Sequence, residues 1–208
     1  MRRRDVMLLA AGAALAATAP GRVRPAAAQA IDRNAILRDP EAPTFGNPTG
    51  DVTLVAFFDY NCPFCKKAEP DLERAATEDG RIRLVFKDWP ILTEASVVGA
   101  RLALAAAYQD GYALVHRALM AIPGRRVPEE QMREAVRRSG VDLARLQADH
   151  DRNSDKITAL LRRNAAQAEA IGLQGTPSYL IGPFRTSTLD YAGFKQAFAE
   201  ARRRQAAP

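Results

Sequence analysis

Residues 52–65 read VTLVAFFDYNCPFC. The first seven form an apolar run interrupted only by Thr53, and such a run is typical of a central strand buried on both faces. Cys62 follows after a short turn, and Cys65 comes three positions later. Proline is favoured at the first position of a helix, so Pro63 indicates that a helix begins directly after Cys62. The stretch therefore predicts a strand, a turn and a helix whose first turn carries both cysteines.

A second strand follows this helix, and the strand pattern returns near the end of the chain. The helix is expected to kink at Pro70 and to end at Asp79-Gly80. Residues 81–87 then read as a strand parallel to the first, because a strand–helix–strand unit implies a parallel pair. The last expected elements are strands at 178–181 and 184–188 and an amphipathic helix at 189–203.

The intervening stretch lacks strand-like runs and is rich in Ala, Leu and Arg. Its helices are expected at 94–108, 111–121, 128–138, 142–149 and 153–171. The chain therefore predicts an α/β fold in which a domain split between 51–93 and 173–204 carries an all-helical insertion at 94–172. Residues 31–50, rich in Pro, Gly and Asn, are expected to form a lead-in of short helix or coil followed by extended chain.

The first 30 residues have the pattern of an export signal. Three arginines, Arg2 to Arg4, precede an apolar run from Val6 to Ala19 that is short for a membrane-spanning helix, which needs ~20 residues. Ala28-Gln29-Ala30 fits the small-x-small pattern that signal peptidase cleaves, so cleavage is expected after about Ala30. The arginines also resemble a twin-arginine signal. An uncleaved membrane anchor is the alternative.

Most of the positive charge belongs to this signal. The whole chain has a net charge of +6, but residues 1–30 carry five Arg and one Asp, which leaves about +2 on the rest. A small positive balance gives no reason to expect a nucleic-acid partner. The arginines at 202–204 suit the end of a helix, where positive charge is favourable.

The two cysteines are the only ones in the chain. Exported proteins normally use cysteines as disulfide staples, but a bridge across two residues closes too small a loop to brace a fold of this size. The pair is therefore expected to do chemistry, to bind a metal or to be incidental. Structural zinc needs four ligands, and beyond the thiols the chain offers only His116 and His150, of which His116 is expected to pack in the core. No cofactor and no metal site is expected, with Cu(I) on the two soft thiolates as the open alternative.

Position on the predicted helix distinguishes the two thiols. Cys62 lies at the helix N-terminus, where free N–H groups and the positive end of the dipole stabilise a thiolate. Cys65 lies one turn further on, is expected to be less exposed, and suits a thiol that resolves a mixed disulfide. Phe64 offers Cys62 neither charge nor hydrogen bond, so the helix end is expected to do most to stabilise the thiolate. Lys66 and Lys67 are expected to be solvated.

Three segments together resemble the DsbA-like branch of the thioredoxin superfamily, and most closely its ScsC-like members. They are residues 57–66 (FFDYNCPFCK), residues 87–92 (KDWPIL) and Gly175-Thr176-Pro177 before an apolar strand. The resemblance extends over about residues 37–203. It implies a thioredoxin-like fold with an inserted helical domain, which agrees with the interpretation of the patterns above.

The resemblance also implies roles for individual residues. Cys62 is expected to be the nucleophile and Cys65 the resolving thiol of a redox-active disulfide. Thr176–Pro177 is expected to be a cis peptide beside this pair, and the main chain of Thr176 to bind an extended substrate segment as an added strand. Pro63 and Phe64 are expected to belong to the same substrate-binding surface.

Three features depart from the pattern of the family. Ala56 stands where many relatives carry a buried acid that relays protons to the resolving thiol, and Asp59 lies nearer the turn, so proton transfer through water is expected. Residues 31–45 are too short for the N-terminal oligomerisation stalk of ScsC-like relatives, which favours a monomer. Thr186-Ser187-Thr188 replaces the Pro-Gly turn that often precedes the last helix.

The leading hypothesis for function is a periplasmic thiol:disulfide oxidoreductase. It would work as a dithiol oxidase on exported proteins with cysteines and be reset by a membrane redox partner. A disulfide isomerase or reductase, kept reduced by a membrane partner, is the close alternative. Thr176 before the proline slightly favours that alternative, whereas the lack of a dimerisation segment favours the oxidase. A Cu(I)-binding copper-tolerance protein is a hypothesis of a different class, and a redox-inert structural module is the last alternative.

Overall fold

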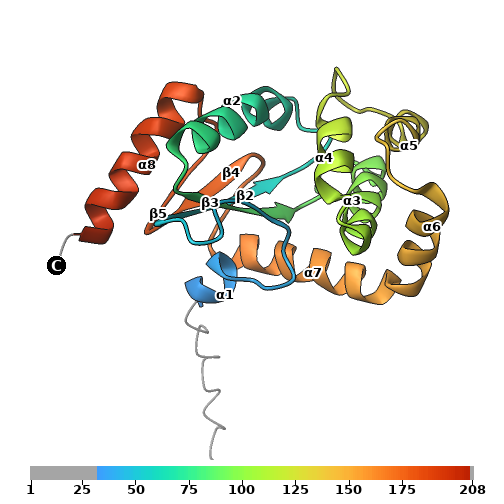
Figure 1. Cartoon of the computed structure of the whole chain (residues 1–208), viewed down its shortest axis with the longest axis horizontal. Helices are drawn as coiled ribbons and strands as arrows, with labels where there is room; N and C mark the ends of the chain where they lie inside the picture. Colours follow the sequence, from blue (N-terminus) through green and yellow to red (C-terminus); the bar gives the residue numbers. More distant parts are fainter. Residues whose placement is uncertain (1–31, 207–208) are drawn as a thin grey trace, which may run out of the picture. The chain divides into compact units, whose positions relative to one another are not determined.

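Figure 1 shows the computed structural model of the chain, which describes residues 32–206. The expected signal peptide, residues 1–30, lies outside these described residues. A helix long and apolar enough to cross a membrane does not occur between residues 32 and 206.

Five strands form one mixed sheet in the order β1-β3-β2-β4-β5. They are β1 (Thr44–Gly46), β2 (Val52–Phe58), β3 (Ile82–Asp88), β4 (Ser178–Ile181) and β5 (Phe184–Thr186). β2 and β3 pair in parallel, as the strand–helix–strand pattern predicted, whereas the other neighbours pair antiparallel. Both central strands are buried along nearly their whole length, which explains their continuous apolar sequences. The predicted α/β fold is confirmed.

Helices cover both faces of this sheet (Figure 1). On one face lie α2 (Pro63–Asp79) and α8 (Tyr191–Ala206), and on the other lie α1 (Arg33–Leu37) and α7 (Ser154–Ala170). Side chains alternate along a strand, so β2 contributes to both layers. Leu54 packs in the buried cluster that contains α2 and α8, and Val55 in the cluster that contains α1 and α7.

The chain between β3 and β4 is helical, as predicted. Its elements are α3 (Glu94–Ala106), a 3-10 turn (Ala107–Gln109), α4 (Tyr112–Met120), α5 (Glu129–Arg137), α6 (Leu143–Arg152) and α7. The end of α7 packs on the sheet, where Ala168 and Ile171 join Val55 and Phe57 in one buried cluster. The helical stretch therefore contributes to the core of the sheet, while α3 to α6 gather beyond one end of it (Figure 1).

The lead-in contains a strand that the sequence did not predict. β1 is only three residues long and pairs antiparallel with β3. A buried ion cluster fastens the segment before it: Asp39 accepts hydrogen bonds from Lys87 of β3 and, at 3.0 Å twice, from the guanidinium of Arg163 on α7. Lys87 is 0% exposed and Asp39 3%. Because a buried charge needs a partner, these contacts hold the lead-in on the fold.

Candidate active site

Cys62 lies at the junction of β2 and α2. Its backbone N–H donates a hydrogen bond to the carbonyl of Asp59 at 3.0 Å, which closes the turn that leaves β2. Cys62 is the N-cap of α2, and its Sγ accepts a hydrogen bond from the backbone N–H of Cys65 at 3.3 Å. Pro63 takes the first helical position, as predicted. The sulfur therefore faces the unpaired N–H groups that every helix start presents.

Two buried polar side chains fix the turn between β2 and α2. Asp59 accepts hydrogen bonds from the backbone N–H groups of Asn61 (2.7 Å), Ile91 (2.8 Å) and Leu92 (2.9 Å). Asn61 binds the main chain of Val127, accepting from its N–H at 2.6 Å and donating to its carbonyl at 3.2 Å. The turn is thereby held by the loop before α3 and by the loop that joins α4 to α5.

Thr176 and Pro177 reach the cysteine pair through the pairing of β2 with β4. Phe57 of β2 is in register with Ser178 of β4, so the loop that precedes β4 lies beside the end of β2. The Thr176–Pro177 peptide bond is cis, the geometry that the resemblance implied. When Cys62 is protonated, its thiol donates a hydrogen bond to the carbonyl of Thr176 at 3.1 Å, across 114 positions of sequence.

The two thiols have opposite ionisation properties. A hydrogen bond from the Cys65 thiol, assisted by the backbone N–H groups of Cys65 and Phe64, outweighs burial and lowers the pKa of Cys62 to about 6. Burial raises the pKa of Cys65 well above its usual range, and the neighbouring Cys62 thiolate adds to this effect. At neutral pH, Cys62 is therefore mainly a thiolate and Cys65 a thiol. The sequence predicted the helix end as the main source of stabilisation; its backbone N–H groups do lower the pKa of Cys62, and the largest single contribution comes from the Cys65 thiol.

Surface exposure does not separate the two thiols. Each cysteine is 2% exposed, whereas the sequence predicts a lower exposure for Cys65. Apolar side chains that face solvent lie around the pair: Phe64, between the cysteines, is 59% exposed, and Ile91 and Leu92, tied to the same turn, are 45% and 49% exposed.

Ala56 on β2 supplies no carboxylate to the cysteine pair. Its partner across the sheet is Tyr179 of β4, and burial raises the pKa of this phenol well above its usual range, so it stays neutral. Asp59 does not replace the missing acid, because its carboxylate is engaged by three backbone N–H groups. Proton exchange of Cys65 through water stays a prediction.

A buried polar network, which the sequence did not predict, joins α2 to α4. The hydroxyl of Tyr60 lies 3.0 Å from Nδ1 of His116, whose Nε2 lies 3.1 Å from Oε1 of Glu69. Nearby, Tyr112 donates to Asp88 at 2.8 Å, and burial raises the pKa of Asp88 to about 6. His116 stacks among four aromatic rings, so its predicted packing role is confirmed. The sequence feature that could have indicated this network is Glu69, an acid that lies one turn after Cys65 on the buried face of α2.

The loop after α4 reaches the first turns of α2. Nζ of Lys66 donates a hydrogen bond to the carbonyl of Gly124 at 3.2 Å, and burial lowers the pKa of this lysine. Lys66 is therefore half-buried rather than fully solvated, and the sequence pattern does not show which distant loop it contacts. Lys67 is exposed, as expected.

Within residues 32–206, no group of three or more His, Cys, Asp or Glu side chains is arranged to hold a metal ion. His150 contacts Arg101 and Asp151. The two cysteines form a dithiol with one ionised sulfur.

Comparisons with known proteins agree with this architecture. The family model described as DSBA-like thioredoxin domain matches residues 53–197. The structure of a thioredoxin-like oxidoreductase from Silicibacter pomeroyi DSS-3 is similar at 37% identity and a TM-score of 0.77, covering 85% of this chain and 99% of that one. The structure of a periplasmic thioredoxin-like protein from Salmonella enterica serovar Typhimurium is similar at 27% identity and a TM-score of 0.71, covering 81% and 94%.

Curated relatives divide into two groups. The thiol:disulfide interchange protein DsbA of Bordetella parapertussis is 30% identical over 200 residues, which span 89% of this chain and 90% of that protein. The Na(+)/H(+) antiporter NhaA 3 of Salinispora tropica is 29% identical over 83% of this chain, but the chain spans only 26% of the antiporter's length. Similarity to such antiporters is thus confined to about a quarter of a longer protein.

Proposed function

The chain belongs to the DsbA-like thioredoxin family, and we propose that it is a thiol:disulfide oxidoreductase that oxidises cysteine pairs in exported proteins. One observation carries this proposal: two adjoining cysteines differ in ionisation, and Sγ of the first lies 3.1 Å from the carbonyl of Thr176. The pKa of Cys62 is lowered to about 6, whereas that of Cys65 is raised. This asymmetry is what a nucleophile and its resolving thiol require.

The reaction begins from the Cys62–Cys65 disulfide. A substrate thiolate attacks Sγ of Cys62, the bond between the two cysteines breaks, and the sulfur of Cys65 leaves as a thiolate that takes up a proton. The second substrate thiolate then attacks the substrate sulfur of the mixed disulfide, so that Cys62 leaves as a thiolate. Two electrons pass from the substrate to the protein, and the substrate gains one disulfide bond.

The proposed direction of electron transfer, from substrate to protein, follows from the stability of the Cys62 thiolate. A thiol of low pKa leaves readily, and a thiolate stabilised in the reduced protein makes the corresponding disulfide a stronger oxidant. The hydrogen bonds from Cys65 stabilise only the reduced state, because no thiolate exists in the disulfide. They therefore favour transfer of electrons from the substrate to the protein.

Substrate binding is proposed to use the main chain of Thr176 and the exposed surface around Cys62. An extended segment that pairs with the backbone beside Pro177 would place its cysteine at Sγ of Cys62. Pro63 and Phe64 would contact the same segment. Such main-chain recognition suits substrates of many sequences, as a general oxidase needs.

The proposed setting is the periplasm, where the protein acts as a monomer. The arginine-rich apolar start of the chain supports export with cleavage after about Ala30, and the Salmonella relative is described as periplasmic. A membrane redox partner would return the cysteine pair to the disulfide after each cycle. We also propose that the exported protein consists of a thioredoxin-like domain split between 51–93 and 173–204 and a helical insertion at 94–172.

Trapping of thiols in intact cells tests this function. The redox state of the pair is fixed by acid, alkylated with a reagent that adds mass, and resolved by electrophoresis. A mostly oxidised pair supports the dithiol oxidase, whereas a mostly reduced pair assigns the protein to the isomerase or reductase class.

The Cys65→Ser variant provides a second measurement. It lacks the resolving thiol, so mixed disulfides with exported proteins should accumulate on Cys62 and disappear on reduction. The Cys62→Ser variant is the matched control and should trap nothing. Absence of trapped partners in Cys65→Ser would count against the mechanism.

A further inference from the structure

A hollow of about 650 Å³ opens beside the active-site turn, between the start of α2 and the loop that follows α4. Its floor and walls include Pro63 and Pro70 of α2 and the apolar side chains of Met120 and Ile122. We call it the α2–α4 groove. Its volume lies in the range of sites that bind ligands through apolar walls and a few polar groups.

The charges on this groove are unbalanced. Its two acids have partners: Glu69 lies 3.1 Å from His116, and Glu73 accepts from Arg117 at 3.0 Å. The lining cations Lys66, Lys67 and Arg125 form no ion pair with any residue between 32 and 206. Lys66 donates only to a neutral carbonyl. The groove therefore presents apolar walls with a net positive rim.

The groove begins at the reacting cysteine. Pro63, which lines it, directly follows Cys62, and the backbone N–H of Lys66 donates to the carbonyl of Cys62 at 3.1 Å. A polypeptide whose cysteine is bonded to Cys62 therefore has neighbouring residues within reach of this groove. Continuity with the reaction site distinguishes the groove from an isolated surface hollow.

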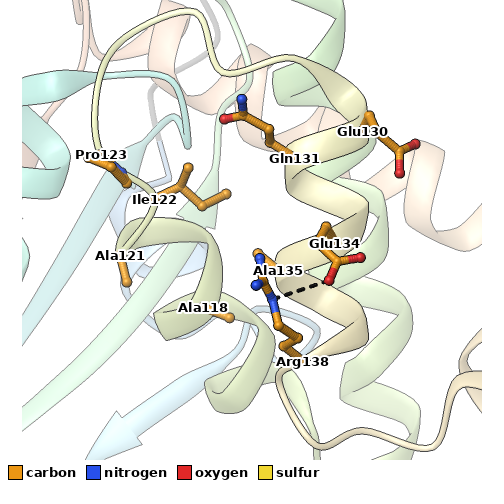
Figure 2. A pocket seen from close by; sticks show the side chains of 9 residues that line it. All are labelled: Ala118, Ala121, Ile122, Pro123, Glu130, Gln131, Glu134, Ala135 and Arg138. Atoms are coloured by element: carbon orange, nitrogen blue, oxygen red, sulfur yellow. Dashed lines mark ion pairs between the residues drawn. The ribbon is translucent and has the colours of Figure 1, made fainter.

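A second hollow of about 600 Å³ lies on the other side of the same loop, against α5 (Figure 2). Its two acids are paired, since Glu134 pairs with Arg138 and with Arg137, and Glu130 pairs with Arg137, which lies outside the lining. Cys62 and its helix contribute nothing to its lining. The two hollows share the loop but not the positive rim.

We propose that the α2–α4 groove binds the residues next to the reacting cysteine of the substrate, and that it selects segments that combine apolar side chains with carboxylates. The inference rests on the proposed function, because it names a substrate preference of the same site. Carboxylates on the substrate would meet Lys67 and Arg125, and its apolar side chains would meet Met120 and Ile122. Exposed ion pairs are individually weak, so the preference is modest, at about 3- to 10-fold in rate for two such pairs.

Three reduced peptides test the preference. Each contains the same two cysteines, and the residues that flank the first cysteine are Leu with Glu, Leu with Gln or Leu with Lys. The oxidised protein is mixed with each peptide, and the rate constant of peptide oxidation is measured after an acid quench. The readout is the ratio of the Glu rate to the Lys rate within one variant, which cancels any change in the reactivity of Cys62.

Charge reversal locates the preference. The variant Lys67→Glu with Arg125→Glu should bring the ratio to 1 or below. The control Lys156→Glu changes a solvent-exposed lysine on α7, which covers the opposite face of the sheet (Figure 1), and should keep the ratio of the wild type. The preference should weaken at high salt, because exposed charges are screened.

The outcomes separate this inference from the proposed function. If no peptide is oxidised, the proposed function fails. If all three are oxidised at equal rates, only the groove inference fails. Equal loss of the ratio in Lys156→Glu would make the preference a property of net charge and would overturn the inference. A wild type that sediments as a dimer, and a charge-reversed variant that sediments as a monomer, would assign the groove to a second copy and overturn it too.

Discussion

Replacing Cys65 by Ala should raise the pKa of Cys62 without returning it to its ordinary value. The change removes the thiol that contributes most to the lowered pKa, but it leaves the backbone N–H of residue 65, which lies 3.3 Å from Sγ of Cys62. A hydrogen bond to a charged group contributes about 1.5–3 kcal/mol, and about 1.4 kcal/mol is a factor of ten in an ionisation constant. The ionisation constant of Cys62 should therefore fall by about 10- to 100-fold.

The matched control is Cys65→Ser, whose hydroxyl can still donate to the Cys62 thiolate. In both variants Cys62 is the only thiol left, so the ultraviolet absorbance of the thiolate reports its titration directly. The rate of alkylation by iodoacetamide against pH gives an independent curve. The order of ionisation constants should be wild type, Ser variant, Ala variant, from highest to lowest.

An Ala variant that keeps the pKa of the wild type would refute this reasoning. The backbone groups at the start of α2 would then account for the thiolate by themselves, as the sequence alone suggested. Identical curves for the Ser and Ala variants would lead to the same conclusion about the side chain at position 65.

Three further predictions concern stability. Reduced protein should be more stable than its Cys62→Ala variant above about pH 8.5, by about 3 kcal/mol relative to the same comparison at low pH. This excess stability should disappear as the pH falls through about 6, because Cys62 ionises at a lower pH in the folded state than in the unfolded chain. Urea unfolding of both proteins at several pH values measures the difference in stability. A difference that does not change with pH contradicts the prediction. Asp39→Asn should lower the free energy of unfolding by about 3–5 kcal/mol, because Lys87 is 0% exposed and loses the carboxylate that pairs with it. The double variant with Lys87→Met should recover part of this loss in the same urea assay. Asn61→Ala should lower the free energy of unfolding by about 1–3 kcal/mol, because the Val127 N–H loses the acceptor that lies 2.6 Å away. The hydrogen exchange of the Val127 amide should become faster. Unchanged exchange would show that this hydrogen bond is dispensable.

Elements with a strong periodic pattern were predictable from the sequence. β2 and β3 are apolar runs because both faces are buried, and the helices between β3 and β4 follow the 3.6-residue spacing of their apolar side chains. The start of α2 at Pro63 was also predictable, because proline and an N-cap position have local signatures. β1 was not, because three residues carry no periodicity and the strand is defined by its pairing with β3.

Contacts of the candidate site that join segments far apart in the chain could not be predicted from local sequence patterns. The approach of Thr176 to Cys62 was expected only from the family resemblance, since 114 positions separate the two residues and the pairing of β2 with β4 brings them together. The bonds of Asn61 to Val127 and of Lys66 to Gly124 depend on which loops meet, and local sequence carries no record of that. The role of the Cys65 thiol as a donor depends on geometry within one helical turn.

The route of the chain between β3 and β4 has a consequence for how this protein can diverge. Cys62 follows β2 and Thr176 precedes β4, which are neighbouring strands of the sheet, whereas the loop after α4 belongs to the helices that lie between β3 and β4 in sequence. If that loop selects substrates as we propose, substitutions at its exposed positions can change which substrates are accepted, whereas Val127 must keep the hydrogen bonds that hold the active-site turn. The proposed substrate choice and the redox chemistry therefore depend on different segments of the chain, and the exposed part of the loop can be changed without touching the two cysteines.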